Sequence, residues 1–186
     1  SKGTTFLVEM WARFTAAADG KYGGTDDNEQ YLFSKTDGTN GISMYRYANQ
    51  PDSTPSVDDP SKIEVRVERS GKTDLVASRD VPTDGDWHHY TVLLADNFLG
   101  VPGFGYLGLM IDGNPGSAPT TVWDSAFPMD DNSQPFTVGK PFEGNDYLPA
   151  DVDSLLIIDH SIDGCLIKKQ VAIHSPAPNL KEDEIC

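Results

Sequence analysis

The chain has 186 residues and a mass of 20.3 kDa, enough for one domain with a sizeable hydrophobic core. Its 29 acidic and 14 basic side chains give a net charge of −15. A field of that sign repels phosphate backbones and anionic lipid, so we expect neither nucleic acid nor a membrane surface as a partner. No apolar run approaches the roughly 18 residues of a membrane-spanning helix, and the lack of a charged-then-apolar leader after Ser1 predicts a mature or excised segment.

Hydrophobic patterning predicts short strands along most of the chain. Within Lys62–Arg69, the apolar residues Ile63, Val65 and Val67 alternate with charged ones, which is typical of a strand with one buried face. Five Asp-Gly pairs lie between or beside the expected strands, and Asp-Gly is a sequence that tight turns favour. The expected strands, in chain order, are Thr5–Phe14, Tyr31–Lys35, Gly41–Tyr47, Lys62–Arg69, Thr73–Arg79, Trp87–Ala95, Tyr106–Ile111, Gln134–Gly139, Val152–Asp159 and Cys165–Ile173.

These strands, with almost no helix signal, predict an all-β fold, namely an antiparallel β-sandwich with long acidic loops. Residues 84–113 hold two apolar runs that each adjoin an Asp-Gly turn, which indicates an antiparallel pair. We expect one domain over residues 1–174. Residues 175–186, with two prolines and an acidic run, are expected to form an extended acidic tail.

Aspartate dominates the acidic residues, with 22 Asp against 7 Glu. Asp is disfavoured inside helices and strands and favoured in turns, so the acidic residues are expected mainly in loops. Three loops are long enough to carry function, at residues 16–30, 48–61 and 115–133. Solubility and turn chemistry alone would also explain this composition.

Several segments resemble the laminin-G-like, concanavalin A-like family of jelly-roll sandwiches. Asp84–Ala95 is similar to the family's Asp-Gly-x-Trp-His-His strand, and Tyr106–Gly113 to the Leu-x-Leu-x-x-Asp-Gly strand that follows it. Further similarities, in the expected order, are Phe6–Arg13, Tyr31–Lys35, Phe136–Gly139 and Ala150–Ile158. The resemblance implies a jelly roll of the kind used mostly by extracellular binding modules, and by a minority of glycosidases and lyases.

Calcium is a cofactor that the acidic loops can accommodate. It takes roughly six to eight oxygen ligands, which adjacent acids in two loops can supply if the loops converge. The resembled family often binds one calcium ion at a loop rim. The candidate ligands are Asp26, Asp27, Asn28, Asp130, Asp131 and Asn132.

Glycan is the ligand class that the loops favour most. Sugar rings stack their C–H faces on exposed aromatic side chains, while carboxylates, amides and hydroxyls bond the sugar hydroxyls. The candidate contact residues are Tyr22, Tyr47, Phe104, Tyr106, Trp123 and Asp124. Trp11 and Trp87 are expected in the core instead.

Catalysis is not expected. The sandwich glucanases place Glu-x-Asp-x-x-Glu on one strand, whereas the nearest analogue here, Asp151-Val152-Asp153, has no following Glu. The chain also lacks a Gly-x-Ser-x-Gly elbow. Asp151 and Asp153 are expected to bond loop backbone groups or a cation. His88 and His89, as neighbours on a strand, point to opposite faces and are interpreted as structural rather than as zinc ligands.

Cys165 and Cys186 are the only cysteines. A disulfide between them would hold the tail against the preceding strand and contribute roughly 3 kcal/mol in the chain-entropy model. Two free thiols, or a bridge to another chain through Cys186, are the alternatives.

An extracellular or cell-surface module for binding or adhesion, with a glycan or protein ligand, is therefore the favoured function. The alternative is a structural subunit of a surface filament, adhesin or virion. The resembled family has a strand upstream of the first similarity, so a sheet edge is expected that Leu166–His174 or a neighbouring chain covers. A glycoside hydrolase or lyase is the third hypothesis.

Overall fold

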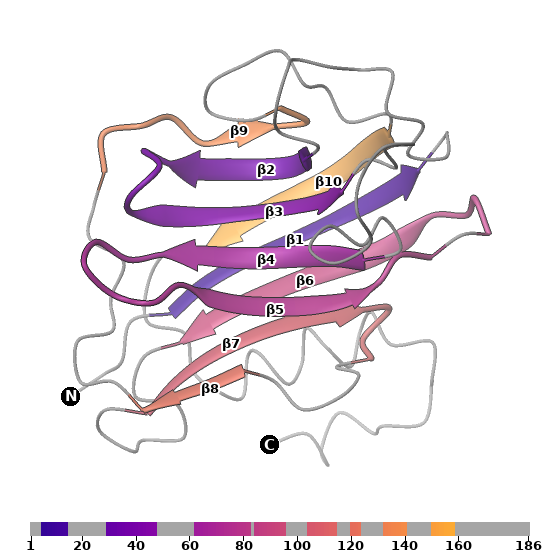
Figure 1. Ribbon diagram of the computed structural model, residues 1–186. Coiled ribbons are helices and arrows are strands. Elements are labelled where there is room, and N and C mark those ends of the chain that lie inside the picture. Colours follow the sequence, from indigo (N-terminus) through magenta and orange to yellow (C-terminus); the bar gives the residue numbers. More distant parts are fainter. Residues whose placement is uncertain are drawn as a thin grey trace, which may run out of the picture. The chain divides into compact units, whose positions relative to one another are not determined.

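A computed structural model describes residues 5–14, 29–47, 62–82, 84–95, 104–114, 120–123, 132–140 and 150–158. Every secondary-structure element among these residues is a strand, and the strands form two five-stranded sheets (Figure 1). A helix long and apolar enough to cross a membrane is not found among them. The predicted all-β class is confirmed.

The first sheet has the strand order β10-β1-β6-β7-β8. The β1–β6, β6–β7 and β7–β8 pairs are antiparallel. The β6–β7 pair is the one predicted from residues 84–113, with Tyr90 opposite Ile111 and Ala95 opposite Tyr106. The strands are β1 (Thr5–Phe14), β6 (His88–Ala95), β7 (Phe104–Ile111), β8 (Thr120–Trp123) and β10 (Ala150–Ile158).

The second sheet has the order β5-β4-β3-β2-β9, and each neighbouring pair is antiparallel. Burial along β4 alternates as predicted, because Ile63, Val65 and Val67 are buried and the charged residues between them are partly exposed. The strands are β2 (Glu29–Thr36), β3 (Gly41–Tyr47), β4 (Lys62–Glu68), β5 (Leu75–Asp80) and β9 (Thr137–Val138).

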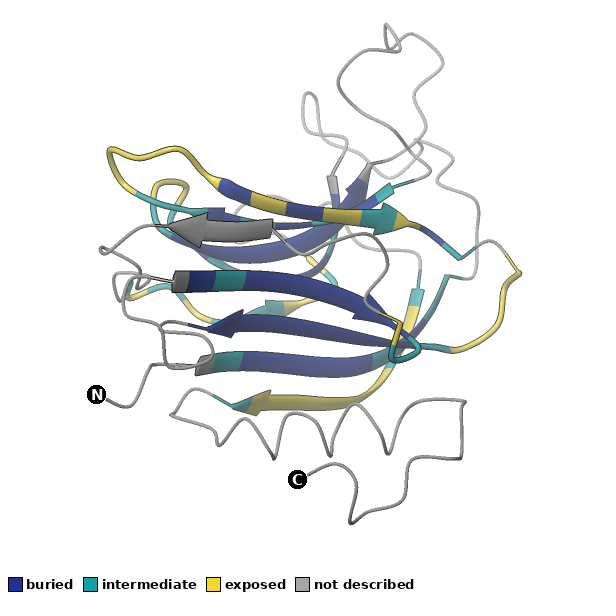
Figure 2. Ribbon diagram, turned by 90° about the horizontal axis from the view of Figure 1, so that it is seen from below, coloured by how far each residue is buried: buried dark blue, intermediate teal, exposed yellow. Residues whose placement is uncertain are grey.

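The central strands β1, β3 and β6 are buried on both faces along most of their length, whereas the edge strands β5 and β10 are not (Figure 2). In β1 the consecutive residues Leu7, Val8, Glu9 and Met10 are all buried. Burial of β6 is similarly continuous from His89 to its end. By contrast, most of β10 is exposed. A strand whose successive side chains are all buried must be covered on both faces of its sheet.

The chain divides into two compact units whose segments alternate along the sequence. One unit contains Ser1–Ala12, His88–Pro128 and Asp153–Cys186, and the other contains Arg13–Trp87 and Met129–Val152. The predicted domain boundary at residue 174 and the predicted strand over 165–173 lie outside the described residues. Both stay predictions.

Three features differ from the expectations drawn from the sequence. Strand β8 lies within residues 115–133, which were expected to be a loop. Strand β9 has two residues where a strand over 134–139 was expected. Trp87 was expected in the core, but it is 39% exposed, because it precedes the first residue of β6 and follows an exposed turn.

Gly41 begins β3 under a steric constraint that no other residue type meets. Its φ is +146°, and a Cβ at this position would lie 2.1 Å from the carbonyl oxygen of Lys35. Only glycine allows the backbone of the β2–β3 turn to approach the end of β2 so closely.

Candidate functional site

Most of the loop residues predicted to contact a ligand or metal lie outside the residues that the structure describes. They are Tyr22, Asp26, Asp27, Asn28, Asp124, Asp130 and Asp131, together with Cys165 and Cys186. The predictions that depend on them stay predictions. Tyr47, Phe104 and Trp123 lie in strands β3, β7 and β8, where their backbone positions alone are described.

Three of the predicted aromatic residues come together along the β7–β8 pair. Phe104 lies opposite Trp123 in the register, and Tyr106 lies opposite Thr121. The Tyr106 ring lies against Gly108, where a Cβ would be 2.6 Å from Tyr106 Cε1. Tyr106 is half-buried, and this burial raises the pKa of its phenol above the ordinary value of 10.0. The β7–β8 pair thus places the phenol of Tyr106 near the backbone positions of Phe104 and Trp123.

Asn132, one of the predicted calcium ligands, connects its segment to β2 and to the β2–β3 turn. Its Nδ2 donates to Asn40 O at 2.8 Å, and its Oδ1 accepts from Gln134 N at 3.1 Å. Lys35 Nζ donates to Asn132 O and Gln134 O, both at 3.1 Å. An ammonium group therefore already lies among the oxygens beside Asn132.

An exposed indole, a guanidinium and a carboxylate meet in what we call the Trp87 cluster, formed by Arg13, Trp87 and Asp151. Arg13 donates from Nε and Nη2 to Asp151 Oδ2 at 3.2 and 2.6 Å. Its Cζ lies 5.1 Å from the centroid of the Trp87 ring, in cation–π range. The side chains of Arg13 and Asp151 are 40% and 48% exposed. The cluster is therefore an ordered aromatic and charged surface open to solvent.

The local sequence explains why Trp87 lies outside the core. Asp84 Oδ1 accepts a hydrogen bond from Asp86 N at 3.0 Å, which closes a tight turn around Gly85 at φ +78°. Pairing with β1 begins only at His88, so Trp87 is not held in the sheet. The turn ends directly before the indole and leaves it exposed.

Three polar groups of the Trp87 cluster have no partner among the residues that the structure describes. Both bonds from Arg13 reach the same oxygen of Asp151, so Asp151 Oδ1 accepts no hydrogen bond from the described residues. Within the same part of the chain, Arg13 Nη1 and the Trp87 indole N–H have no acceptor. An acceptor and two donors thus adjoin an apolar ring, which is the chemistry that a sugar ring and its hydroxyls require.

The two histidines of β6 make contacts within their own sheet, and the prediction that they are structural stays a prediction. His88 Nδ1 lies 2.6 Å from Asp112 Oδ2, and Asp112 Oδ1 accepts from His89 N at 2.9 Å. His89 is buried, and its ring centroid lies 5.2 Å from that of Trp11. The described residues contain no group of three or more metal-ligating side chains.

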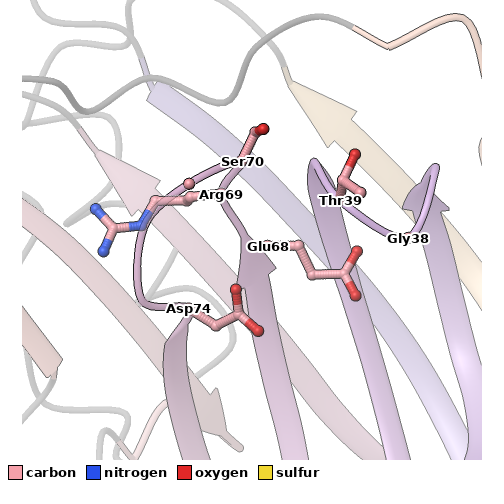
Figure 3. Close-up of a pocket in the computed structure, with 7 residues that line it drawn as sticks. Gly38, Thr39, Glu68, Arg69, Ser70 and Asp74 are labelled. Atoms are coloured by element: carbon pink, nitrogen blue, oxygen red, sulfur yellow. The ribbon is translucent and has the colours of Figure 1, made fainter.

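A second surface feature is a polar hollow of about 240 Å³ between two turns of the second sheet (Figure 3). Figure 3 shows the carboxylates of Glu68 and Asp74 between the turns, with Thr39 and Ser70 at the rim and the Arg69 guanidinium pointing away. A hydrogen bond joins the two turns, because Ser70 N donates to Asn40 Oδ1 at 2.9 Å. Its lining contains no aromatic residue, so it offers hydroxyl and carboxylate contacts without a stacking surface.

Comparisons with known proteins give structural matches only. No family model and no curated protein matches the chain. The binding domain of botulinum neurotoxin serotype D matches with a TM-score of 0.54 and 10% identity, over 90% of this chain and 35% of that chain. A mutant of HCR/D matches with a TM-score of 0.55 and 11% identity, over 89% of this chain and 36% of that chain. The receptor-binding domain of botulinum neurotoxin D gives a TM-score of 0.51 and 12% identity, over 90% and 37%.

This likeness shows the fold, and the predicted antiparallel β-sandwich class is confirmed. The chain spans about a third of the length of these structures. The laminin-G-like resemblance, which no family model supports, stays a prediction.

Sequence reasoning missed the Trp87 cluster. It placed Trp87 in the core and considered Asp151 only together with Asp153. Arg13 and Asp151 are 138 residues apart, so no spacing rule connects them. The available signal was the Asp-Gly turn immediately before Trp87, because a residue between a turn and the first paired position of a strand is often exposed.

Proposed function

We propose that this chain is an extracellular, non-catalytic binding module that takes glycan at the Trp87 cluster. The observation that carries the proposal is the exposed indole of Trp87, held beside polar atoms of Arg13 and Asp151 that have no partner among the described residues. The cation–π contact orders the ring before a ligand arrives, so less conformational entropy is lost on binding.

The fold of the matched structures supports binding rather than another use of the sandwich. The matched proteins are described as a binding domain of botulinum neurotoxin serotype D and a receptor-binding domain of botulinum neurotoxin D. A fold hosts many functions, so this is support by analogy and the Trp87 cluster has to carry the specific assignment.

The carboxylates near the cluster favour binding over hydrolysis. A retaining glycosidase needs one carboxylic acid that donates a proton and a second carboxylate that attacks. Asp151 forms an ion pair with Arg13 at 2.6 Å, and Asp153 Oδ1 accepts a hydrogen bond from Ser154 N at 2.7 Å. Both side chains thus make structural contacts, and no Glu follows them in the spacing of the glucanase strand.

Calcium assistance, through residues 26–28 and 130–132, and the extracellular or cell-surface location are part of the proposal. Melting of the protein with and without EDTA tests the calcium component by itself. A melting temperature that does not change would remove calcium and leave glycan binding at the Trp87 cluster unaffected.

A glycan array probed with the wild-type chain and with Trp87→Ala tests the proposal. We expect signals for a defined set of glycans that Trp87→Ala loses, while Val76→Ala, a change at an exposed apolar residue of β5, retains them. Trp123→Ala is the competing variant, because Trp123 is the tryptophan among the contact residues expected from the sequence. Loss of signal with Trp123→Ala alone would move the site to the β7–β8 pair, and a blank array would contradict glycan binding.

Strand β10 favours self-assembly as a second candidate function. It is the outermost strand of its sheet among the described residues. Its consecutive apolar residues Leu155, Leu156 and Ile157 are each 39–40% exposed. Strand edges with exposed apolar residues recruit further strands. Sedimentation velocity tests this candidate: a species larger than the 20.3 kDa monomer that Leu156→Lys dissociates would support it, and a monomer at high concentration would refute it.

A further inference from the structure

We infer that the Trp87 cluster selects uncharged sugars over acidic ones. The inference rests on the proposed glycan-binding function and adds the class of sugar. It follows from the presence of both donors and an acceptor that have no partner in the described part of the chain, and from the sign of the charge around them.

The hydrogen-bonding groups of the cluster match hydroxyls better than carboxylates. Asp151 Oδ1 is an acceptor without a donor in the described part of the chain, and Arg13 Nη1 is a donor without an acceptor there. A sugar hydroxyl both donates and accepts, so neighbouring hydroxyls can satisfy both atoms. A carboxylate or sulfate only accepts, so it would leave Asp151 Oδ1 without a donor and facing a like charge.

The guanidinium of Arg13 offers an anion only part of its set of donors. Its Nε and Nη2 both donate to Asp151 Oδ2, so the side-on fork is already in use. An acidic sugar bound at Nη1 would lie beside the Asp151 carboxylate and be repelled by it. A neutral sugar can bind beside the intact ion pair.

The surrounding charge also disfavours an anion. The exposed turn before Trp87 carries Asp84 and Asp86. Together with Asp151 and Arg13, these described residues have a summed charge of −2 (1 − 3). The whole chain has the same sign, at −15. An acidic glycan would therefore approach against the field, and added salt would screen that repulsion.

Pairs of arrayed glycans that share one core, one neutral and the other sialylated, glucuronylated or sulfated, test the inference at low and at physiological salt. We expect the neutral member of each pair to bind at least about tenfold more tightly, the difference of one charge-assisted hydrogen bond. We also expect salt to strengthen only the acidic members. Asp151→Asn should weaken neutral binding and improve acidic binding. Asp86→Asn is the matched control. It removes one negative charge from the same region without changing a contact of Arg13, so it should leave neutral binding unchanged.

The outcomes separate the two proposals. Glycan binding that Trp87→Ala abolishes, but that prefers the acidic members, would overturn the selectivity and leave the proposed function intact. Neutral binding that Asp151→Asn does not change would also overturn it, because Asp151 Oδ1 would then receive no ligand hydroxyl. Absence of binding to every pair would overturn both. The ion pair is exposed and contributes little to folding, so Asp151→Asn is expected to remain folded.

Discussion

Replacement of Gly41 by alanine is expected to be among the most destabilising single changes in the second sheet. At φ +146° an L-residue is strained by about 1–3 kcal/mol. The new Cβ would lie 2.1 Å from Lys35 O, so the turn must open. Opening of the turn would break the two hydrogen bonds that Asn40 accepts, from Ser70 N at 2.9 Å and from Asn132 Nδ2 at 2.8 Å. At about 1 kcal/mol per hydrogen bond, the total is about 4 kcal/mol.

Thermal denaturation of Gly41→Ala beside Gly71→Ala is the assay. Gly71 also has positive φ, at +69°, but a Cβ there meets nothing within 4 Å. Its replacement should therefore cost only about 1 kcal/mol, the conformational term alone. For a chain of this size the first variant should lose roughly 8–16 °C in Tm and the second roughly 2–4 °C. Equal losses of Tm in the two variants would refute the reasoning, because the close approach at Gly41 would then make no contribution to stability.

Three further changes have defined outcomes. Val65→Ala removes two methyl groups from a fully buried site and should lower the free energy of unfolding by about 2.5 kcal/mol in a urea titration, and a loss below about 1 kcal/mol would contradict its place in the core. Bonds from Asn40 N–H and from Thr39 hold the pKa of Asp37 below its ordinary value of 3.8, so its carboxylate stabilises the fold above that pH and the effect is lost as pH falls through the lower, folded-state pKa. Asp37→Asn should therefore be less stable than wild type at pH 7 and equally stable at strongly acidic pH, and a constant difference would rule out this titration. Asp112→Ala leaves the His89 N–H without its acceptor and should cost about 2 kcal/mol, whereas no change in the unfolding midpoint would show that water replaces the carboxylate.

Strands with a clear period of two could be predicted from the sequence. The bounds of β3 agree with the prediction, and those of β4 differ by one residue. Their alternation is set by the pleat, which is a local property of the backbone. Strand β8 was not predicted because its four residues, Thr120–Trp123, are too few to show a period of two. The residues on either side of it are proline, aspartate and serine, which are typical of loops.

The candidate site was less predictable because it depends on contacts between distant parts of the chain. Trp87 was assigned to the core from the average tendency of large aromatic residues to be buried, which the preceding turn overrides here. Its contact with Arg13, and the ion pair between Arg13 and Asp151, arise only when strand ends meet. The fold class thus follows from local pattern, whereas the site follows from tertiary arrangement.

Two-dimensional NMR of the tryptophan indole N–H groups, during titration with the strongest neutral glycan from the array, tests the central claim most directly. The chain has three tryptophans, Trp11, Trp87 and Trp123, so their signals can be assigned by single replacement. We predict that the Trp87 signal shifts in a saturable manner while those of Trp11 and Trp123 stay in place. A saturable shift confined to Trp123, or binding without any shift of Trp87, would contradict the account.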